Sequence, residues 1–306
     1  MRTRPLGRRA ALATPLLAFI PGARAQSTGE GLRGGLLALH RAASHRGLTG
    51  SWDRPGVPIR ADLLPPAGEA HVAAAEARMG RPMPPGLRHF FREVTAGLDV
   101  AWMLPGRRRV TAMGLARVEY AAVPPPPFGR PGPPPDPVIN AGGLRIALDD
   151  AEALGGEWRQ WRDARRESER GAADPAERAH HRYHAEVWER GYPIARTMGG
   201  DIVAVDTADT AERLMVLRHD GDDAPALLLG QDLRVHLAQQ ARLLFPGFET
   251  YRMELFADDG QGRDAVAAFA PGVDALVRDH GLFLPQPCVL DADGANALAW
   301  RAWMGV

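Results

Sequence analysis

The feature that most constrains this fold is a corner, RMGRPMPPGLRHFF at residues 78–91, between two stretches with helical periodicity. Gly80 and three prolines interrupt a helix here, because proline lacks the amide hydrogen that helical hydrogen bonds need. We therefore predict two helices joined by a corner over residues 69–96, with Gly97 as the C-terminal cap of the second. The corner is expected to be scaffold and not a site of chemistry. The apolar positions that carry the two periodicities are Val72, Ala75, Met79, Leu87, Phe90, Phe91 and Val94.

The basic residues are all arginine, 37 of them against 37 acidic residues, and lysine is absent. The absence of lysine excludes Schiff-base enzymes, P-loop nucleotide-binding proteins and protein kinases, since each class depends on a lysine side chain. The single cysteine, Cys288, excludes an intramolecular disulfide. A chain of 306 residues, 45% of them hydrophobic, is long enough for one large domain or two small ones.

Residues 1–25 have the three regions of an export signal in the expected order. A basic segment with the adjacent pair Arg8 and Arg9, as in twin-arginine signals, precedes a short apolar segment, and Ala-Arg-Ala stands before Gln26. We therefore expect cleavage before Gln26 and an exported, periplasmic protein. The alternatives are an ordinary N-terminal helix in a cytoplasmic protein, or a translation start further along the chain.

Removal of this segment would change the charge of the protein. Loss of its five arginines leaves 32 arginines against 37 acidic residues, a net charge of −5. A mildly acidic protein without a basic stripe is a poor partner for nucleic acid, so we exclude that class. No apolar run approaches the roughly 20 residues that a membrane-spanning helix needs, so we also expect no membrane span.

The remaining pattern predicts an α+β fold with a largely antiparallel sheet flanked by helices. Short strand-like runs follow Gly97, and a helix is expected where Leu154, Trp158 and Trp161 recur at helical spacing. Another helix is predicted to begin at Asp174, as its N-cap, and Pro175, and to end at Gly191. Four strand-like runs at hairpin spacing and a closing helix come next. We divide the chain into a domain at 26–245, with an exposed proline-rich insertion at 124–137, and a C-terminal α/β extension at 246–306.

The strongest sign of catalytic chemistry is the pair His180 and His184, four residues apart on a predicted helix, a spacing at which two imidazoles can share a zinc ion. The residue after the first histidine is His181, where a zinc protease has glutamate, and the sequence identifies no third ligand. A solvated polar face is the better interpretation. Since serine-nucleophile and dinucleotide-binding motifs are also absent, we expect no enzyme activity, metal or cofactor. A metal-dependent enzyme using the two histidines is the least favoured alternative.

Two blocks of sequence together resemble the SUKH superfamily, the Smi/Knr-type domains related to regulators of cell-wall assembly. The second block has a Gly-Asp that opens a strand and a later strand that ends in His-Asp, followed by the helix of LGQDLRVHLAQQ. The resemblance covers roughly residues 30 to 245. The residues that carry the first block are Val72, Glu76, Gly80, Pro84, Leu87, Phe90, Gly97 and Trp102, and those of the second are Gly200, Asp201, Asp206, His219 and Asp220.

This resemblance implies an α+β fold and a protein-binding function without catalysis. Many bacterial members are immunity proteins that bind and neutralise toxins, and the fungal relatives are regulatory scaffolds. An export signal and the extension after residue 245 depart from the usual pattern, and they favour the alternative of an exported envelope protein with a wall-related scaffolding role. The expected partner is therefore a protein, either a toxin or an envelope component.

Large aromatic residues are either core residues or anchors of an interface. Trp102, in an apolar run directly after a helix, is predicted to lie in the core. Trp158 and Trp161 stand among arginines, so one of them is a candidate anchor, although burial against the sheet is the favoured outcome. The full candidate interface consists of Trp158, Trp161, Asp201, Asp206, His219 and Asp220.

Overall fold

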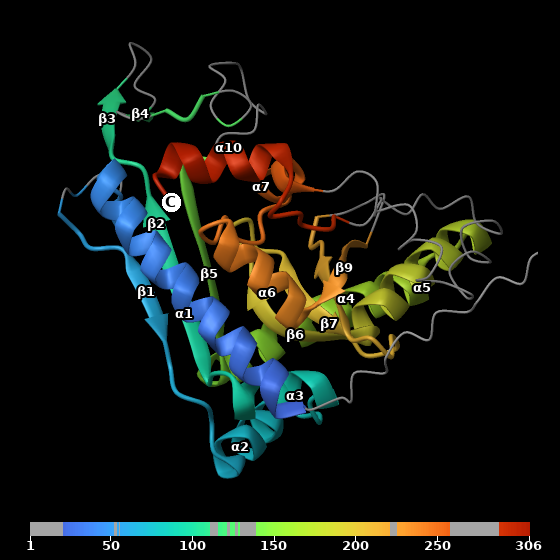
Figure 1. Ribbon diagram of the computed structural model, residues 1–306. Coiled ribbons are helices and arrows are strands. Elements are labelled where there is room, and N and C mark those ends of the chain that lie inside the picture. Colours follow the sequence, from blue (N-terminus) through green and yellow to red (C-terminus); the bar gives the residue numbers. More distant parts are fainter. Residues whose placement is uncertain are drawn as a thin grey trace, which may run out of the picture.

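The fold is mixed α+β, as predicted, with antiparallel sheets and helices packed on them (Figure 1). Most of the expected export signal (residues 1–20) and of the proline-rich insertion, and residues 258–287 of the C-terminal extension, lie outside the described residues. Pro124, Pro125 and Phe128 of that insertion are described. Pro125 is exposed, as predicted, whereas Pro124 and Phe128 are buried. The computed structural model describes residues 21–51, 54, 56–110, 116–120, 123–125, 128, 139–220, 225–257 and 288–306.

The N-terminal half is built on a three-stranded antiparallel sheet in the order β1-β2-β5, with a separate β3–β4 hairpin. Alternate residues of β2 and β5 are buried, which is the pattern of strands with one face on a core. The long helix α1 lies across this sheet, and the two helices of the predicted corner are α2 and α3 (Figure 1). The elements are α1 (Pro21–Arg46), β1 (Arg60–Leu63), α2 (Glu69–Met79), α3 (Pro85–Glu93), β2 (Gly97–Met103), β3 (Gly106–Val110), β4 (Ala116–Tyr120) and β5 (Ala141–Ala147).

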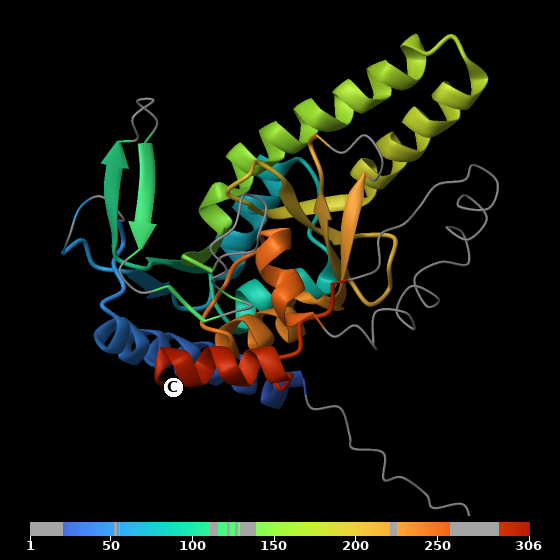
Figure 2. The same cartoon turned by 90° about the horizontal axis from the view of Figure 1, so that it is seen from above.

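The C-terminal half contains a four-stranded antiparallel meander in the order β6-β7-β8-β9. Before it, helices α4 and α5 form a long hairpin that projects beyond the sheets (Figure 2). The side chain of Asp174 accepts a hydrogen bond from the amide of Ala176 and caps α5, as predicted. The elements are η1 (Leu148–Asp150), α4 (Ala151–Gly171), α5 (Pro175–Arg190), β6 (Gly191–Arg196), β7 (Ile202–Asp206), β8 (Arg213–Leu217), β9 (Ala226–Asp232), α6 (Leu233–Arg242), α7 (Thr250–Met253), η2 (Glu254–Phe256) and α10 (Ala295–Met304).

Trp102 lies at the centre of the main core, as predicted, and is fully buried. Its indole Nε1 donates to the carbonyl of Leu244 at 2.8 Å, and its ring stacks on Trp300 with centroids 6.0 Å apart. Gly142 faces this ring so closely that a Cβ atom there would lie 2.5 Å from it. Since Trp300 belongs to the C-terminal extension, the described part of that extension packs into the same core as the rest of the chain.

The corner between α2 and α3 has the predicted form. Gly80 ends α2 with φ +78°, a left-handed conformation that glycine adopts without the strain a side chain brings. The Glu76 carboxylate accepts a hydrogen bond from the amide of Met83 at 3.0 Å, which holds the turn. Pro84 and Pro85 then occupy the N-cap and first positions of α3, where a missing amide hydrogen costs little.

Gly97 is not the cap of α3, and this prediction was wrong. The helix ends at Glu93 with Val94 as its C-cap, and Gly97 is the first residue of β2. A Cβ atom at Gly97 would lie 3.3 Å from the Cβ of Ala147 across the sheet, so close packing against β5 favours glycine here. The side chain of Thr95 makes the turn between helix and strand by accepting from the amide of Gly97 at 3.0 Å.

The corner also joins the two halves of the chain. Glu212, between β7 and β8, accepts hydrogen bonds from the amides of Gly86 at 2.8 Å and Leu87 at 3.0 Å. These amides belong to the first turn of α3, where a helix has unpaired donors and a partial positive charge. Glu212 makes this contact from a left-handed backbone conformation, with φ +51°, which is unfavourable for a residue with a side chain.

We predict that Glu212→Ala lowers the free energy of unfolding by about 1–2 kcal/mol, because α3 loses the carboxylate that caps it. Glu212→Gly removes the same cap but relieves the left-handed strain, so it should cost about 1 kcal/mol less than Glu212→Ala. Urea unfolding of both variants measures the difference. Glu167→Ala, at an exposed position on α4, is the matched control. Equal stability of Glu212→Ala and that control would contradict the proposed joint.

Candidate functional site

A groove of about 500 Å³ lies between the two halves, next to β5 and the end of β6. Both strands are the edges of their sheets, and within the described residues neither edge is paired with another strand. The first turn of α4 and the β6–β7 turn close the groove at its sides. The small or apolar residues that line it are Val100, Ala101, Met103, Ala141, Gly142, Gly143, Leu144, Ala153, Leu154, Ala195, Met198 and Phe248.

Charged side chains at the rim of the groove are held by one another. Arg145 donates to Asp150 at 2.7 and 3.0 Å and to Asp99 at 3.0 Å, and hydrogen bonding to these carboxylates, that of Asp150 first, raises the arginine pKa. Arg60 lies 3.3 Å from Asp99. Arg196 forms an ion pair with Glu157. The rim therefore carries both signs of charge in fixed pairs.

The lining of the groove has the composition of a binding surface. Its described residues include no histidine, cysteine, serine or tyrosine, and two of its carboxylates, Asp99 and Asp150, are engaged by Arg145. Thr197 supplies a hydroxyl group to this lining, and Glu249 supplies a third carboxylate. Met198, at the β6–β7 turn, is 75% exposed beside it, an unusual state for a large apolar side chain.

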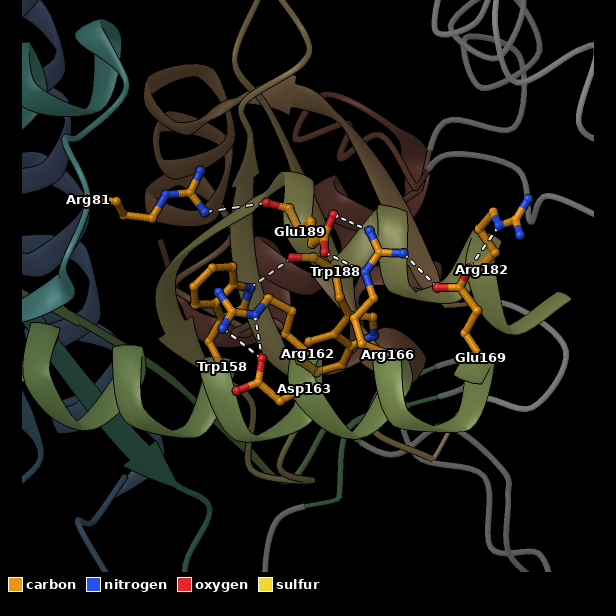
Figure 3. Close-up of polar contacts among 9 residues, drawn as sticks. All are labelled: Arg81, Trp158, Arg162, Asp163, Arg166, Glu169, Arg182, Trp188 and Glu189. Atoms are coloured by element: carbon orange, nitrogen blue, oxygen red, sulfur yellow. Dashed lines mark hydrogen bonds and ion pairs between the residues drawn. The ribbon is translucent and has the colours of Figure 1, made fainter. Parts of the chain in front are cut away.

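The tryptophans of the predicted interface divide between core and surface. Trp158 is buried, and its indole Nε1 donates to the carbonyl of Trp188 at 2.8 Å, which ties α4 to α5 (Figure 3). Trp161 is half-buried and packs against Trp188, with centroids 6.4 Å apart, and against His219, with centroids 5.6 Å apart. Burial against the sheet, the favoured outcome, holds for Trp158, and Trp161 keeps an exposed edge.

A chain of ion pairs links the two helices of the α4–α5 hairpin (Figure 3). Arg166 binds both carboxylate oxygens of Glu189, at 2.6 and 2.5 Å, and also Glu169 at 2.7 Å. Glu169 in turn accepts from Arg182 at 2.8 Å, and hydrogen bonding to Arg182 and Arg166 lowers the pKa of this carboxyl. These bidentate contacts orient the hairpin, but their charges largely cancel.

Asp201, His219 and Asp220, three residues of the candidate interface, come together beside β7 and β8. One oxygen of Asp201 accepts from the amide of His219 at 3.1 Å and contacts its Nδ1 at 2.8 Å. Asp220 is exposed beside them, and one possible ligand atom from each residue lies within 4.8 Å of the others. Arg165 donates to the carbonyl of His219 at 2.6 Å, which places a positive charge next to the group.

Asp206, the remaining acidic residue of the predicted interface, is fully buried. Arg190 donates to it at 3.1 Å through Nε and makes a second contact through Nη2. The same carboxylate accepts from the amide of Ala208 at 3.0 Å. Asp206 therefore holds the turn after β7 in place and is not open to a partner.

His180 and His184 lie side by side on α5, with ring centroids 4.3 Å apart. Within the described residues they are not part of any group of three ligands that a metal ion would need. His184 is buried, and its Nε2 has no hydrogen-bond partner among the described residues. Burial, together with His180 and Arg165 nearby, lowers the pKa of His184 to about 3, so its ring is neutral near pH 7.

The groove was not predicted from the sequence, because the residues that line it come from segments that are distant along the chain. The pair Gly142 and Gly143 was the available signal, since glycine inside a strand often marks a close approach of another backbone or a ligand. Gly143 has φ +150°, and a Cβ atom there would lie 2.4 Å from the carbonyl oxygen of Val100. A side chain at this position would therefore distort the wall of the groove.

No protein-family model matches the chain, and no curated protein sequence matches it. The resemblance to the SUKH superfamily therefore rests on the residues of the two blocks alone. In the structure these blocks are in direct contact, because Glu212 of the second caps the helix that follows the corner of the first. Within the described part of the chain, no helix is both long and apolar enough to cross a bilayer.

Stability is predicted to fall as the pH is lowered from about 6.5 towards 3. Burial lowers the pKa of His184 and of His236 to about 3, so the unfolded chain binds protons in this range that the folded chain does not. Each histidine should contribute up to about 1.4 kcal/mol of lost stability per pH unit. Urea unfolding between pH 7 and pH 4 measures the slope, which should be shallower in His184→Phe. Parallel curves for the variant and the natural protein would contradict this assignment.

Trp158→Ala should lower the free energy of unfolding by about 3–5 kcal/mol, since it opens a cavity and removes the bond to Trp188. Trp161→Ala should cost less than half as much, because this side chain is only half-buried. Paired thermal and urea unfolding of the two variants measures both effects. Losses of the same size would show that Trp161 is as much a core residue as Trp158.

Proposed function

We propose that this chain is a non-catalytic, protein-binding module of the SUKH type, and that its partner docks in the groove between β5 and β6. The observation that carries the proposal is the groove itself, which joins an apolar floor to a rim of charges already paired. Protein interfaces combine an apolar centre with a polar rim in the same way. Arginine–carboxylate pairs that are formed before binding lose less conformational freedom when a partner arrives.

The form of the groove favours an extended polypeptide segment as the occupant. Edge strands offer unpaired backbone groups to which another strand can bind. Gly142 and Gly143 on β5 line the groove with backbone alone. Met198, exposed at the rim, would cover apolar side chains of the bound segment, since its flexible thioether adapts to irregular surfaces.

The proposed partner is a toxin that the protein neutralises or an envelope component that it organises. If the partner is an envelope component, the protein would be exported through its twin-arginine signal. Helix α1 begins at Pro21 and extends across the expected cleavage position before Gln26. Its buried residues Leu32, Leu36 and Leu39 come after that position, so cleavage would leave this apolar face intact. N-terminal sequencing of the native protein distinguishes the compartments, because Gln26 as the first residue indicates export.

The docking proposal predicts that a charge introduced at the groove abolishes partner binding. The chain is used as bait in its native cells, the partner is identified by mass spectrometry, and the affinity of the purified pair is then measured by calorimetry. Met198→Asp and Ala153→Arg should each weaken binding at least about tenfold, because interface centres tolerate unpaired charge poorly. Both positions are exposed, so neither change should disturb the fold.

Val235→Asp is the matched control, since Val235 is an exposed apolar residue on α6 outside the groove. This variant should bind the partner as the natural chain does. Unfolding midpoints of all three variants should match that of the natural chain. Equal affinity of the groove variants and the control would place the partner elsewhere on the protein and contradict the proposal.

A further inference from the structure

A second hollow, of about 370 Å³, lies beside Trp158 at the junction of α2, α4 and α5, and arginines surround it. Arg81 comes from the corner after α2, and Arg159 and Arg162 come from α4 (Figure 3 shows the first and last of these). The guanidinium carbons of Arg81 and Arg162 lie 5.1 and 4.8 Å from the centre of the Trp158 ring. The hollow is large enough for a small molecule, since such sites span about 300–1,000 Å³.

The contacts of these arginines orient them without cancelling their charge. Arg81 donates to the main-chain carbonyls of Glu189 and Gly191, at 3.4 and 3.1 Å. Arg159 donates to the carbonyl of Met79 at 2.8 Å. Among the described residues, neither arginine has a carboxylate within ion-pair distance. The carbonyls belong to the C-terminal ends of α5 and α2, each of which carries only about half a negative charge.

The acidic residues nearby leave a net positive charge in the hollow. Glu189 lines it, but both of its carboxylate oxygens are bound by Arg166. Asp163 pairs with Arg162 at 2.7 Å, from a side chain that is 65% exposed to solvent. Three arginines therefore exceed one exposed carboxylate and two helix ends, so their mutual repulsion is only partly relieved within the described residues.

The pKa of Arg81 also reflects this surplus of positive charge. Burial is the main cause that lowers that pKa, Tyr192 raises it, and the positive charge of Arg162 lowers it. Capping of two helices explains the positions of Arg81 and Arg159, and the i, i+4 spacing on α4 places Arg162 against the same ring. An oxyanion between the guanidinium groups would relieve the repulsion and receive charge-assisted hydrogen bonds from their planar donor groups.

We propose that this hollow is a binding site for the phosphate group of a small phosphorylated molecule. The planar guanidinium groups match phosphate oxygens in pairs, and a phosphate monoester carries between one and a half and two negative charges near pH 7. The remaining volume of the hollow accommodates the group to which the phosphate is attached. This site is separate from the groove between β5 and β6, so it does not depend on the proposed protein-binding function.

The test is calorimetric titration of the full chain with glycerol 2-phosphate, inorganic phosphate and acetate at constant ionic strength. Glycerol 2-phosphate should saturate a single site, and Arg162→Gln should weaken it about tenfold or more, since one charged hydrogen-bonding group is lost. Asp163→Asn removes the competing carboxylate and should strengthen binding several-fold. Inorganic phosphate that binds as tightly as the monoester would show that the phosphate group alone is recognised, which supports the site.

Arg182→Gln is the matched control, because it removes an arginine of the same helical hairpin that lies outside the hollow. This variant should bind glycerol 2-phosphate as the natural chain does. Equal unfolding midpoints for the variants show that the hollow is intact in each. Equal weakening by Arg162→Gln and Arg182→Gln would indicate only general attraction of anions and overturn the proposal. Acetate that binds as tightly as phosphate, or a titration without saturable heat, would overturn it as well.

Discussion

The carboxylate of Glu212 joins two halves of a chain that have separate sheets. It accepts from the first amides of α3, so it stabilises that helix and fixes the corner against the β7–β8 turn. The backbone at Glu212 adopts a left-handed conformation to reach this position. Strain of this kind persists where surrounding contacts determine the geometry, and here the strain is offset by one carboxylate serving two amide donors.

The groove and the arginine-lined hollow both lie on elements from the two halves that this joint helps to hold together. With the corner fixed, the three-stranded sheet and the four-stranded meander meet at the edges of β5 and β6 without forming one continuous sheet. The groove is the space left between these edges. On the other side of the corner, Arg81 is brought over Trp158 and completes the positively charged hollow. The Glu212 contact acts together with other links between the halves, such as the hydrogen bond from Trp102 to Leu244.

Local sequence signals predicted the elements of this fold well. Asp174 and Pro175 marked the start of α5, and the prolines after Gly80 marked the corner, because caps and breakers act within a few residues. Gly97 was wrongly predicted to be a helix cap. Glycine is favoured at this position because of close packing against a cross-strand neighbour, Ala147, which is fifty residues away in the sequence. Glycine at the end of a helical pattern suits a cap and a tightly packed strand equally well, and only the partner strand decides between them.

The candidate sites were harder to predict than the elements, because they depend on contacts between distant segments. Asp201, His219 and Asp220 were all predicted as interface residues, but their contact with one another forms only when β7 pairs with β8. Asp206 was predicted to lie at the interface, but in the structure it is buried and paired with Arg190. The groove and the cationic hollow are each lined by three or more segments that are distant in the sequence. A local sequence pattern cannot predict that such segments will be in contact.

Hydrogen exchange of the protein with and without its bound partner tests the docking surface most directly. Because a segment docked between β5 and β6 would cover the outer edges of both strands, we predict slower amide exchange at residues 141–145 and 195–198. Exchange in α10, residues 295–304, should be unchanged by the partner. Protection confined to α10 or to the tip of the α4–α5 hairpin, with no change along β5 and β6, would contradict the proposed binding mode.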